Sequence, residues 1–94
     1  MTGYVYIMAN DRNGTIYVGV TANLCRRTWQ HQEGVGSQFT QKYALKKLVY
    51  YKFFENIENA IAEETKIKWW KRDWKLRLIE ERNPQWKDLS HELV

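Results

Sequence analysis

Three consecutive segments decide how this chain begins to fold: Tyr4–Met8 (YVYIM), Asn10–Gly14 (NDRNG) and Thr15–Val20 (TIYVGV). The first and third segments alternate large side chains, a pattern typical of β-strands. The segment between them is rich in turn residues, and its final Asn-Gly step favours a hairpin because both residue types tolerate a positive φ. The sequence therefore predicts two neighbouring antiparallel strands joined by a tight turn.

The segment after the hairpin predicts a helix and then a loop. Thr21 or Asn23 can cap a helix that runs to about Gln32. Gly34 follows that helix and is a typical helix-ending residue. Polar and small residues continue beyond it, so a loop is expected over Glu33–Gln38.

One more strand and two more helices complete the predicted order. Leu48–Glu55 is rich in Val, Tyr and Phe, which favour a strand. Asn56 can cap a helix over Ile57–Trp70. Asp73 can cap another over Trp74–Glu81, before the single proline of the chain. The order strand, strand, helix, strand, helix, helix is typical of one small sheet covered by helices.

The composition indicates one folded domain with a preference for anionic partners. The 94 residues are 44% hydrophobic and 15% aromatic, enough for one core, so a single domain over residues 1–94 is expected. A net charge of +4 favours a polyanionic partner. Cys25 is the only cysteine, so no intrachain disulfide and no disulfide-linked partner are expected. No stretch approaches the roughly 18 apolar residues of a membrane span, and a cytoplasmic protein without a membrane partner is expected.

A carboxylate is predicted on an apolar helix face. Glu64 falls in the middle of a stripe on the helix over Ile57–Trp70. A lone carboxylate on an inward face is destabilising unless a cation satisfies it. The sequence leaves two interpretations open, a metal ligand or a structural salt bridge with a nearby Lys or Arg. The stripe consists of Ile57, Ala60, Ile61 and Ile67.

Arg27 and His31 are four residues apart and therefore share one face of the first predicted helix. Such a pair can hold a phosphate, with Arg as a two-pronged donor and His as a hydrogen-bond or proton partner. The alternative is an ordinary pair of surface polar residues. The spacing alone favours that alternative.

Tyr6 and Tyr17 lie at alternating positions of the two hairpin strands, so their phenols can share one face of the sheet. The alternative is half-buried packing with solvated hydroxyl groups. Gly19 is more informative, because a glycine inside a strand weakens it unless a backbone or ligand must approach closely.

A basic, tryptophan-rich segment over Lys66–Arg77 (KIKWWKRDWKLR) holds six of the fifteen basic residues. Basic side chains neutralise phosphates, and an exposed Trp can stack on an unpaired base. The alternative is that the tryptophans belong to the core and the lysines are merely solvated; we expect both in part, with at least one Trp buried. The residues expected to bind DNA are Lys66, Lys68, Trp70, Lys71, Arg72 and Lys75.

Together, these pieces resemble the GIY-YIG nuclease domain. Gly3–Tyr6 (GYVY), Tyr17–Gly19 (YVG), Arg27 and His31 stand in the order and spacing of its motifs. The resemblance spans roughly residues 3–89 and is strongest to the short bacterial group in which this domain is the entire protein. The first motif reads YVY and the second YVG in place of GIY and YIG, and neither departure removes a functional group.

The resemblance implies an α+β fold in which helices flank a small three-stranded antiparallel sheet (order β-β-α-β-α-α). It also implies one divalent-metal site, for Mg²⁺ or Mn²⁺. A hard cation keeps several waters, so a single carboxylate suffices when a DNA phosphate completes the shell. The matching catalytic positions are Tyr6, Tyr17, Arg27, His31 and Asn83, with Glu64 as the metal ligand.

The expected function is a metal-dependent DNA endonuclease with weak sequence preference, acting in DNA repair or processing, with single-stranded, nicked or branched DNA as preferred forms. Tyr6 is the expected general base, its pKa lowered by the metal or by Arg27, and His31 is its replacement. Tyr17 would orient the attacking water. Two other functions stay open: a catalytically idle DNA-binding module for branched or damaged DNA, and a protein-interaction domain using the basic tryptophan-rich segment.

Overall fold

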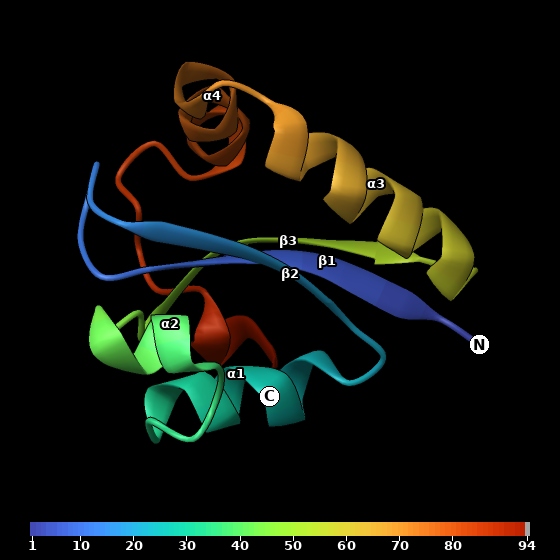
Figure 1. Ribbon diagram of the computed structural model, residues 1–94, viewed down its shortest axis with the longest axis horizontal. Coiled ribbons are helices and arrows are strands. Elements are labelled where there is room, and N and C mark those ends of the chain that lie inside the picture. The colour runs from blue at the N-terminus through green and yellow to red at the C-terminus, as the bar shows by residue number, and fades with distance from the viewer. Residues whose placement is uncertain (94) are drawn as a thin grey trace.

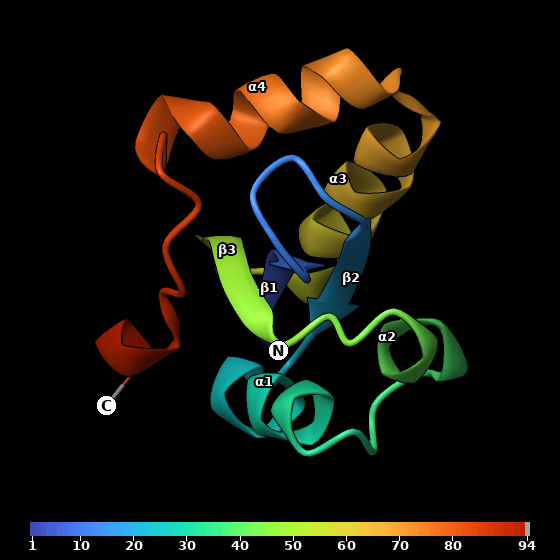
Figure 2. The same cartoon turned by 90° about the vertical axis from the view of Figure 1, so that its left-hand side faces the viewer.

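A computed structural model describes residues 1–93 of the chain. Its sheet has the strand order β2-β1-β3, and both pairings are antiparallel. The helices lie in two layers, with α3 and α4 on one face of the sheet and α1 and α2 on the other (Figures 1 and 2). The strands are β1 (Gly3–Ala9), β2 (Ile16–Thr21) and β3 (Lys47–Phe54). The helices are α1 (Leu24–Gln32), α2 (Gln38–Lys42), α3 (Ile57–Trp69), α4 (Arg72–Arg82) and the 3₁₀ helix η1 (Ser90–Leu93).

The predicted α+β fold with a three-stranded antiparallel sheet is confirmed, and α2 and η1 are additions to it. The helix α2 has only five residues and begins where the predicted loop ends; Ser37 caps it by accepting the backbone N–H of Thr40. Such a short helix is stable only through tertiary contacts, so it could not be predicted from its own sequence. The predicted cap of α4 was also wrong. That helix begins at Arg72, and Asp73 lies in its first turn.

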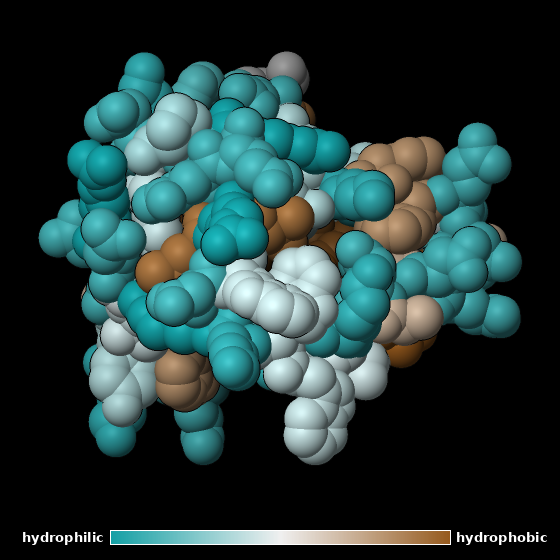
Figure 3. Space-filling model, turned by 90° about the horizontal axis from the view of Figure 1, so that it is seen from above, coloured by the Kyte–Doolittle hydropathy of each residue, from teal (hydrophilic) through white to brown (hydrophobic). Residues whose placement is uncertain are grey.

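The two faces of β1 belong to two different cores. Val5 and Ile7 face α3 and α4 and pack with Ile67 and Ile79. The alternate residues, among them Tyr6, face α1 in a second cluster. Seen from the side of α3 and α4, the surface is mostly hydrophilic, with apolar residues visible among the polar ones (Figure 3). None of the helices described in residues 1–93 is long and apolar enough to span a membrane.

The apolar stripe predicted on α3 is partly correct. Ala60 and Ile67 are completely buried and Ile57 is half-buried, whereas Ile61 is 47% exposed. Ile61 was therefore wrongly assigned to the inward face, because the sheet covers a narrower arc of the helix than the stripe spans. Glu64 lies at the border of the buried arc, with 15% of its side chain exposed.

Gly19 permits a close approach within the sheet. The register pairs Tyr6 with Gly19 across β1 and β2, and a Cβ atom at Gly19 would overlap the Tyr6 ring. The Tyr6 side chain therefore lies directly over the bare backbone of β2. The same register pairs Met8 with Tyr17, which puts both tyrosines on the α1 face, as predicted.

Candidate active site

The central contact of the site is a buried hydrogen bond between a strand and a helix. The Tyr6 hydroxyl lies 2.9 Å from Nε2 of His31, and both residues are 1% exposed. Nδ1 of His31 lies 3.0 Å from the Thr40 hydroxyl, which donates its own proton to the Ser37 carbonyl. That hydroxyl is thus left as an acceptor, so Nδ1 carries the hydrogen and Nε2 accepts from Tyr6.

Helix α1 presents this histidine through its capping and its buried face. Asn23 caps the helix by accepting the backbone N–H of Arg26. Leu24, Thr28 and His31 form the buried face. The view that Arg27 and His31 are ordinary surface residues is therefore wrong for His31, which is enclosed between the sheet and α2.

Arg27 approaches the same tyrosine from the solvent side. Its Nε donates to the Tyr6 hydroxyl over 3.4 Å, and its Nη1 donates to Oε1 of Gln30 over 3.0 Å. The hydrogen bond to Tyr6 raises the pKa of Arg27, so the guanidinium remains charged. The Tyr6 oxygen thus accepts from a cation and donates to a neutral imidazole.

Burial determines the protonation of this group. It raises the pKa of Tyr6 to about 12, and the opposing hydrogen bond from Arg27 offsets only part of the effect. Burial also lowers the pKa of His31 to about 4, with the charge of Arg27 acting in the same direction. Arg27 does lower the Tyr6 pKa, as expected, but burial outweighs it, so the expectation of a net lowered pKa is wrong in the free protein. Both groups are neutral near pH 7.

An aromatic row, defined here as Tyr6, Tyr17, Phe39 and Tyr43, leads from this buried pair to the surface. Successive ring centroids are 6.4, 6.2 and 4.9 Å apart. The last two rings belong to α2 or follow it, and they are 44% and 39% exposed. Sequence reasoning missed them because α2 was not predicted, although their spacing of four residues is that of one helical face.

Glu64 lies on α3, over the opposite face of the sheet, and is connected to this group through Lys68. Because β2 is an edge strand, a side chain on α3 can extend past it. Nζ of Lys68 lies 3.4 Å from Oε1 of Glu64 and 5.9 Å from the centre of the Tyr17 ring. The charge of Glu64 is also one of the minor causes that raise the pKa of Tyr6. Glu64 therefore has the lysine partner that the salt-bridge interpretation required, and this lysine lies beside the Tyr17 ring.

The donor set restricts which cation this site could hold. Within the described part of the chain, no three His, Cys, Asp or Glu side chains gather as a metal site. Glu64 would offer one carboxylate, so a bound ion would keep most of its ligands as water or phosphate oxygens. This donor chemistry fits Mg²⁺ or Mn²⁺ and does not fit a structural zinc site.

Asn83 does not join the group. It is 5% exposed and lies at the end of α4, where its Nδ2 donates to the carbonyls of Val49 (3.1 Å) and Lys87 (2.8 Å). Its Oδ1 accepts the backbone N–H of Lys87 over 3.0 Å. With these bonds the Asn83 amide connects the chain after α4 to β3. These hydrogen bonds are structural, and the structure places Asn83 outside the group around the Tyr6 hydroxyl.

The basic residues expected to bind DNA have mixed surroundings. Lys66 pairs with Glu63, and Arg72 donates to the carbonyls of Asn13 and Gly14, which fastens α4 to the β1–β2 turn. Lys71 is exposed and carries no side-chain cap bond. Part of the hydrogen-bonding capacity of Arg72 is therefore used within the protein and is not free for DNA.

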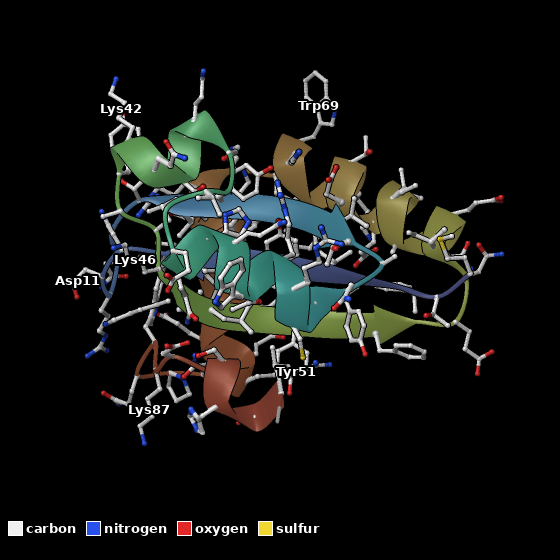
Figure 4. The ribbon with its side chains drawn as sticks, turned by 90° about the horizontal axis from the view of Figure 1, so that it is seen from below. Asp11, Lys42, Lys46, Tyr51, Trp69 and Lys87 are labelled. Atoms are coloured by element: carbon white, nitrogen blue, oxygen red, sulfur yellow. The ribbon has the colours of Figure 1, made fainter. Side chains whose placement is uncertain are left out.

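The tryptophans of this segment also differ in how far they are buried. Trp70 is half-buried against the core, so the expected DNA contact is a packing residue in part, whereas Trp69 is 85% exposed. Trp69 and Lys42 both project beyond the edge of the sheet formed by β2 (Figure 4). Lys75 lines a shallow groove that also includes Ile16 and Phe39, so a basic and aromatic surface continues from the site along this edge.

Lowering the pH should destabilise the wild-type protein more than a His31→Gln variant. Because the pKa of His31 is lowered to about 4 in the folded state, the unfolded chain binds an extra proton between its usual pKa of 6.5 and that value. Neutral His31 therefore contributes stability that is fully present above pH 6.5 and is lost as the pH falls toward 4, by about 3 kcal/mol at most. Urea denaturation at about pH 7 and pH 4.5 measures it. An equal loss in both proteins would contradict the burial of an uncharged imidazole.

Comparison with known proteins identifies the family. The profile of the GIY-YIG catalytic domain matches residues 2–77. UPF0213 protein CPE1444 of Clostridium perfringens is 41% identical over 76 residues, which cover 81% of each chain. UPF0213 protein OB0043 of Oceanobacillus iheyensis is 39% identical, over 82% of this chain and 88% of its own.

A solved structure is similar over nearly the whole fold. The solution NMR structure of the UPF0213 protein BH0048 of Bacillus halodurans matches with a TM-score of 0.59 and 28% identity, covering 94% of this chain and 93% of its own. The fold, the two tyrosine motifs and the matched profile agree. The chain belongs to the GIY-YIG family of nuclease-type domains.

Proposed function

We propose that this protein is a divalent-metal-dependent DNA endonuclease that hydrolyses the phosphodiester backbone. The observation that carries the proposal is the Tyr6 hydroxyl, held between the charged guanidinium of Arg27 and the unprotonated Nε2 of His31. A phenol with a proton acceptor on one side and a phosphate-binding cation on the other is arranged for general base catalysis at a phosphate.

Arg27 is the first group to meet the substrate. It is half-buried, and its bond to Tyr6 is long, so an arriving phosphate can draw the guanidinium away. Tyr6 is 1% exposed in the free protein, and this movement would open a path for water to its hydroxyl. Arg27 then donates to the phosphate oxygens, on which negative charge grows in the transition state. Tyr17, beside Tyr6, orients the water.

Proton transfer follows the hydrogen bond that already exists. Tyr6 takes a proton from the attacking water as it passes its own proton to Nε2 of His31, and Thr40 keeps the imidazole oriented through Nδ1. As the water oxygen bonds to phosphorus, the P–O bond to the leaving end of the strand breaks, and the leaving oxygen takes a proton from solvent. In the free protein this transfer is strongly unfavourable, because the pKa values are about 12 and about 4. A phosphate anion nearby raises the imidazole pKa and so favours the transfer. A divalent cation on Glu64 would neutralise charge on the phosphate and stabilise a phenolate.

Purified protein should nick supercoiled DNA with Mg²⁺ or Mn²⁺ and not with excess chelator, and Glu64→Gln should abolish both cleavage and metal binding. The stability of Glu64→Gln without metal should change by about 1 kcal/mol or less, because its partner Lys68 is half-exposed. Glu63→Gln removes a neighbouring carboxylate that is paired to Lys66, and it should keep activity. Gel assays beside thermal melting measure these effects.

Each other result has a distinct meaning. A Glu64→Gln protein that is destabilised but proportionately active would reduce Glu64 to a salt-bridge residue. DNA binding without cleavage of any DNA form would support the idle binding module. Binding to a protein partner that is insensitive to salt, with no DNA affinity, would support the interaction domain.

Tyr6→Phe and Arg27→Ala should each lower turnover by about 10²–10³ while the protein remains folded. The first change removes only the hydroxyl that contacts His31, and the second removes the cation beside it. Single-turnover cleavage under saturating DNA separates these losses from weaker binding. Tyr17→Phe removes the hydroxyl proposed to orient the water and should lose less than Tyr6→Phe. Full activity in Tyr6→Phe would move the base role to His31.

The exposed end of the aromatic row supports a preference for DNA with unpaired bases. The Phe39→Ala/Tyr43→Ala double variant should bind single-stranded or branched DNA more weakly, by about 1–3 kcal/mol per lost base stack, with little change for paired duplex. Fluorescence anisotropy with each DNA form measures this difference. Phe53→Ala removes another exposed ring, on β3, and serves as the control. Equal losses for all DNA forms would argue against base stacking by this row.

A further inference from the structure

The half-buried carboxylate of Glu64 already has a cation beside it. Its side chain is 15% exposed, whereas that of Lys68, one helical turn later, is 48% exposed. The Lys68 ammonium lies 3.4 Å from Oε1 of Glu64 and 5.9 Å from the Tyr17 ring centre. The carboxylate is thus held by the fold, while its cation belongs to a half-exposed side chain and has a second favourable contact on the Tyr17 ring.

We propose that Lys68 is a resident counter-ion of Glu64 which a divalent metal must displace in order to bind. The inference rests on the proposed function, which assigns the metal to Glu64. A Mg²⁺ ion binds carboxylate oxygens at about 2.1 Å, so it would approach the same oxygen more closely than the ammonium does. Two cations that share one carboxylate repel each other at this range. Metal affinity is therefore set by a competition between the ion and Lys68.

In the metal-free protein, Lys68 stabilises the Glu64 carboxylate. A carboxylate that is mostly withdrawn from water needs a counter-charge at all times, and Lys68 supplies it without a metal. Because the ammonium is half-exposed, it can leave at small cost when a stronger cation arrives. The Glu64 carboxylate is then neutralised in the absence of metal, and its counter-ion can still be exchanged.

The chain contains a matched control on the same helix. Lys66 lies 2.9 Å from Glu63 and 5.8 Å from the centre of the Trp70 ring, a similar arrangement of carboxylate, ammonium and aromatic ring. This second trio contains none of the residues around the Tyr6 hydroxyl. A general effect of removing one lysine from α3 would appear at both positions, whereas competition for the metal would appear at Lys68 alone.

The test is a calorimetric titration of Mn²⁺ into the DNA-free protein. Lys68→Met should bind Mn²⁺ about tenfold more tightly than wild type, since one nearby like charge is gone. Lys68→Arg keeps the charge and should bind as wild type does, and so should Lys66→Met. Glu64→Gln should lose the binding. Unchanged or weaker binding in Lys68→Met, with Glu64 still required, would overturn the counter-ion role and leave the proposed function standing.

A second measurement uses the wild-type protein without any substitution. Mass spectrometry after brief acetylation reports how reactive each lysine amine is. Adding Mn²⁺ should raise the reactivity of Lys68 relative to Lys66, because the displaced ammonium loses its partner. Equal reactivity with and without bound Mn²⁺ would overturn the proposal. Absence of Mn²⁺ binding in every DNA-free protein would overturn this inference, whereas the metal-dependent function is decided by the cleavage assay, in which a DNA phosphate can complete the metal shell.

Discussion

The rest of the site depends on one buried hydrogen bond, from the Tyr6 hydroxyl to Nε2 of His31. It joins the central strand to α1, and two neighbouring positions are glycines whose missing side chains leave room for the two rings. A Cβ at Gly19 would overlap the Tyr6 ring, and one at Gly36 would overlap the His31 ring. Thr40 on α2 binds the other imidazole nitrogen. A strand, two helices and two glycines are therefore arranged around a single phenol–imidazole contact.

The burial that holds this pair also keeps it unreactive. Removing a phenol and an imidazole from water penalises the charged form of each, so the pKa values move apart, to about 12 for Tyr6 and about 4 for His31. The nearby charge of Arg27 opposes the first shift and adds to the second. The group is a neutral hydrogen-bonded pair at rest, and only a change in the surrounding charges can make proton transfer favourable.

The topology explains how residues from opposite faces of the sheet come together. Tyr17 lies on the face covered by α1, and Glu64 lies on α3 over the other face. A central strand would separate them, but β2 is an edge strand, and Lys68 spans the edge by contacting both. The exposed side chains Lys42 and Trp69 flank the same edge (Figure 4), so the carboxylate, its lysine and the aromatic row lie beside an open surface.

The sequence by itself determined the parts that depend on local patterns. Residue patterns located three strands and three of the helices, and capping residues correctly marked the start of α1 and α3 but not of α4. Gly19 indicated a close approach, and Glu64 was recognised as a charge within an apolar stripe. Only the tertiary structure decided the burial of His31, the existence of α2 and the backbone bonds of Asn83. The physical reason is that burial and pKa depend on which distant segments pack against a residue, and no local pattern contains that information.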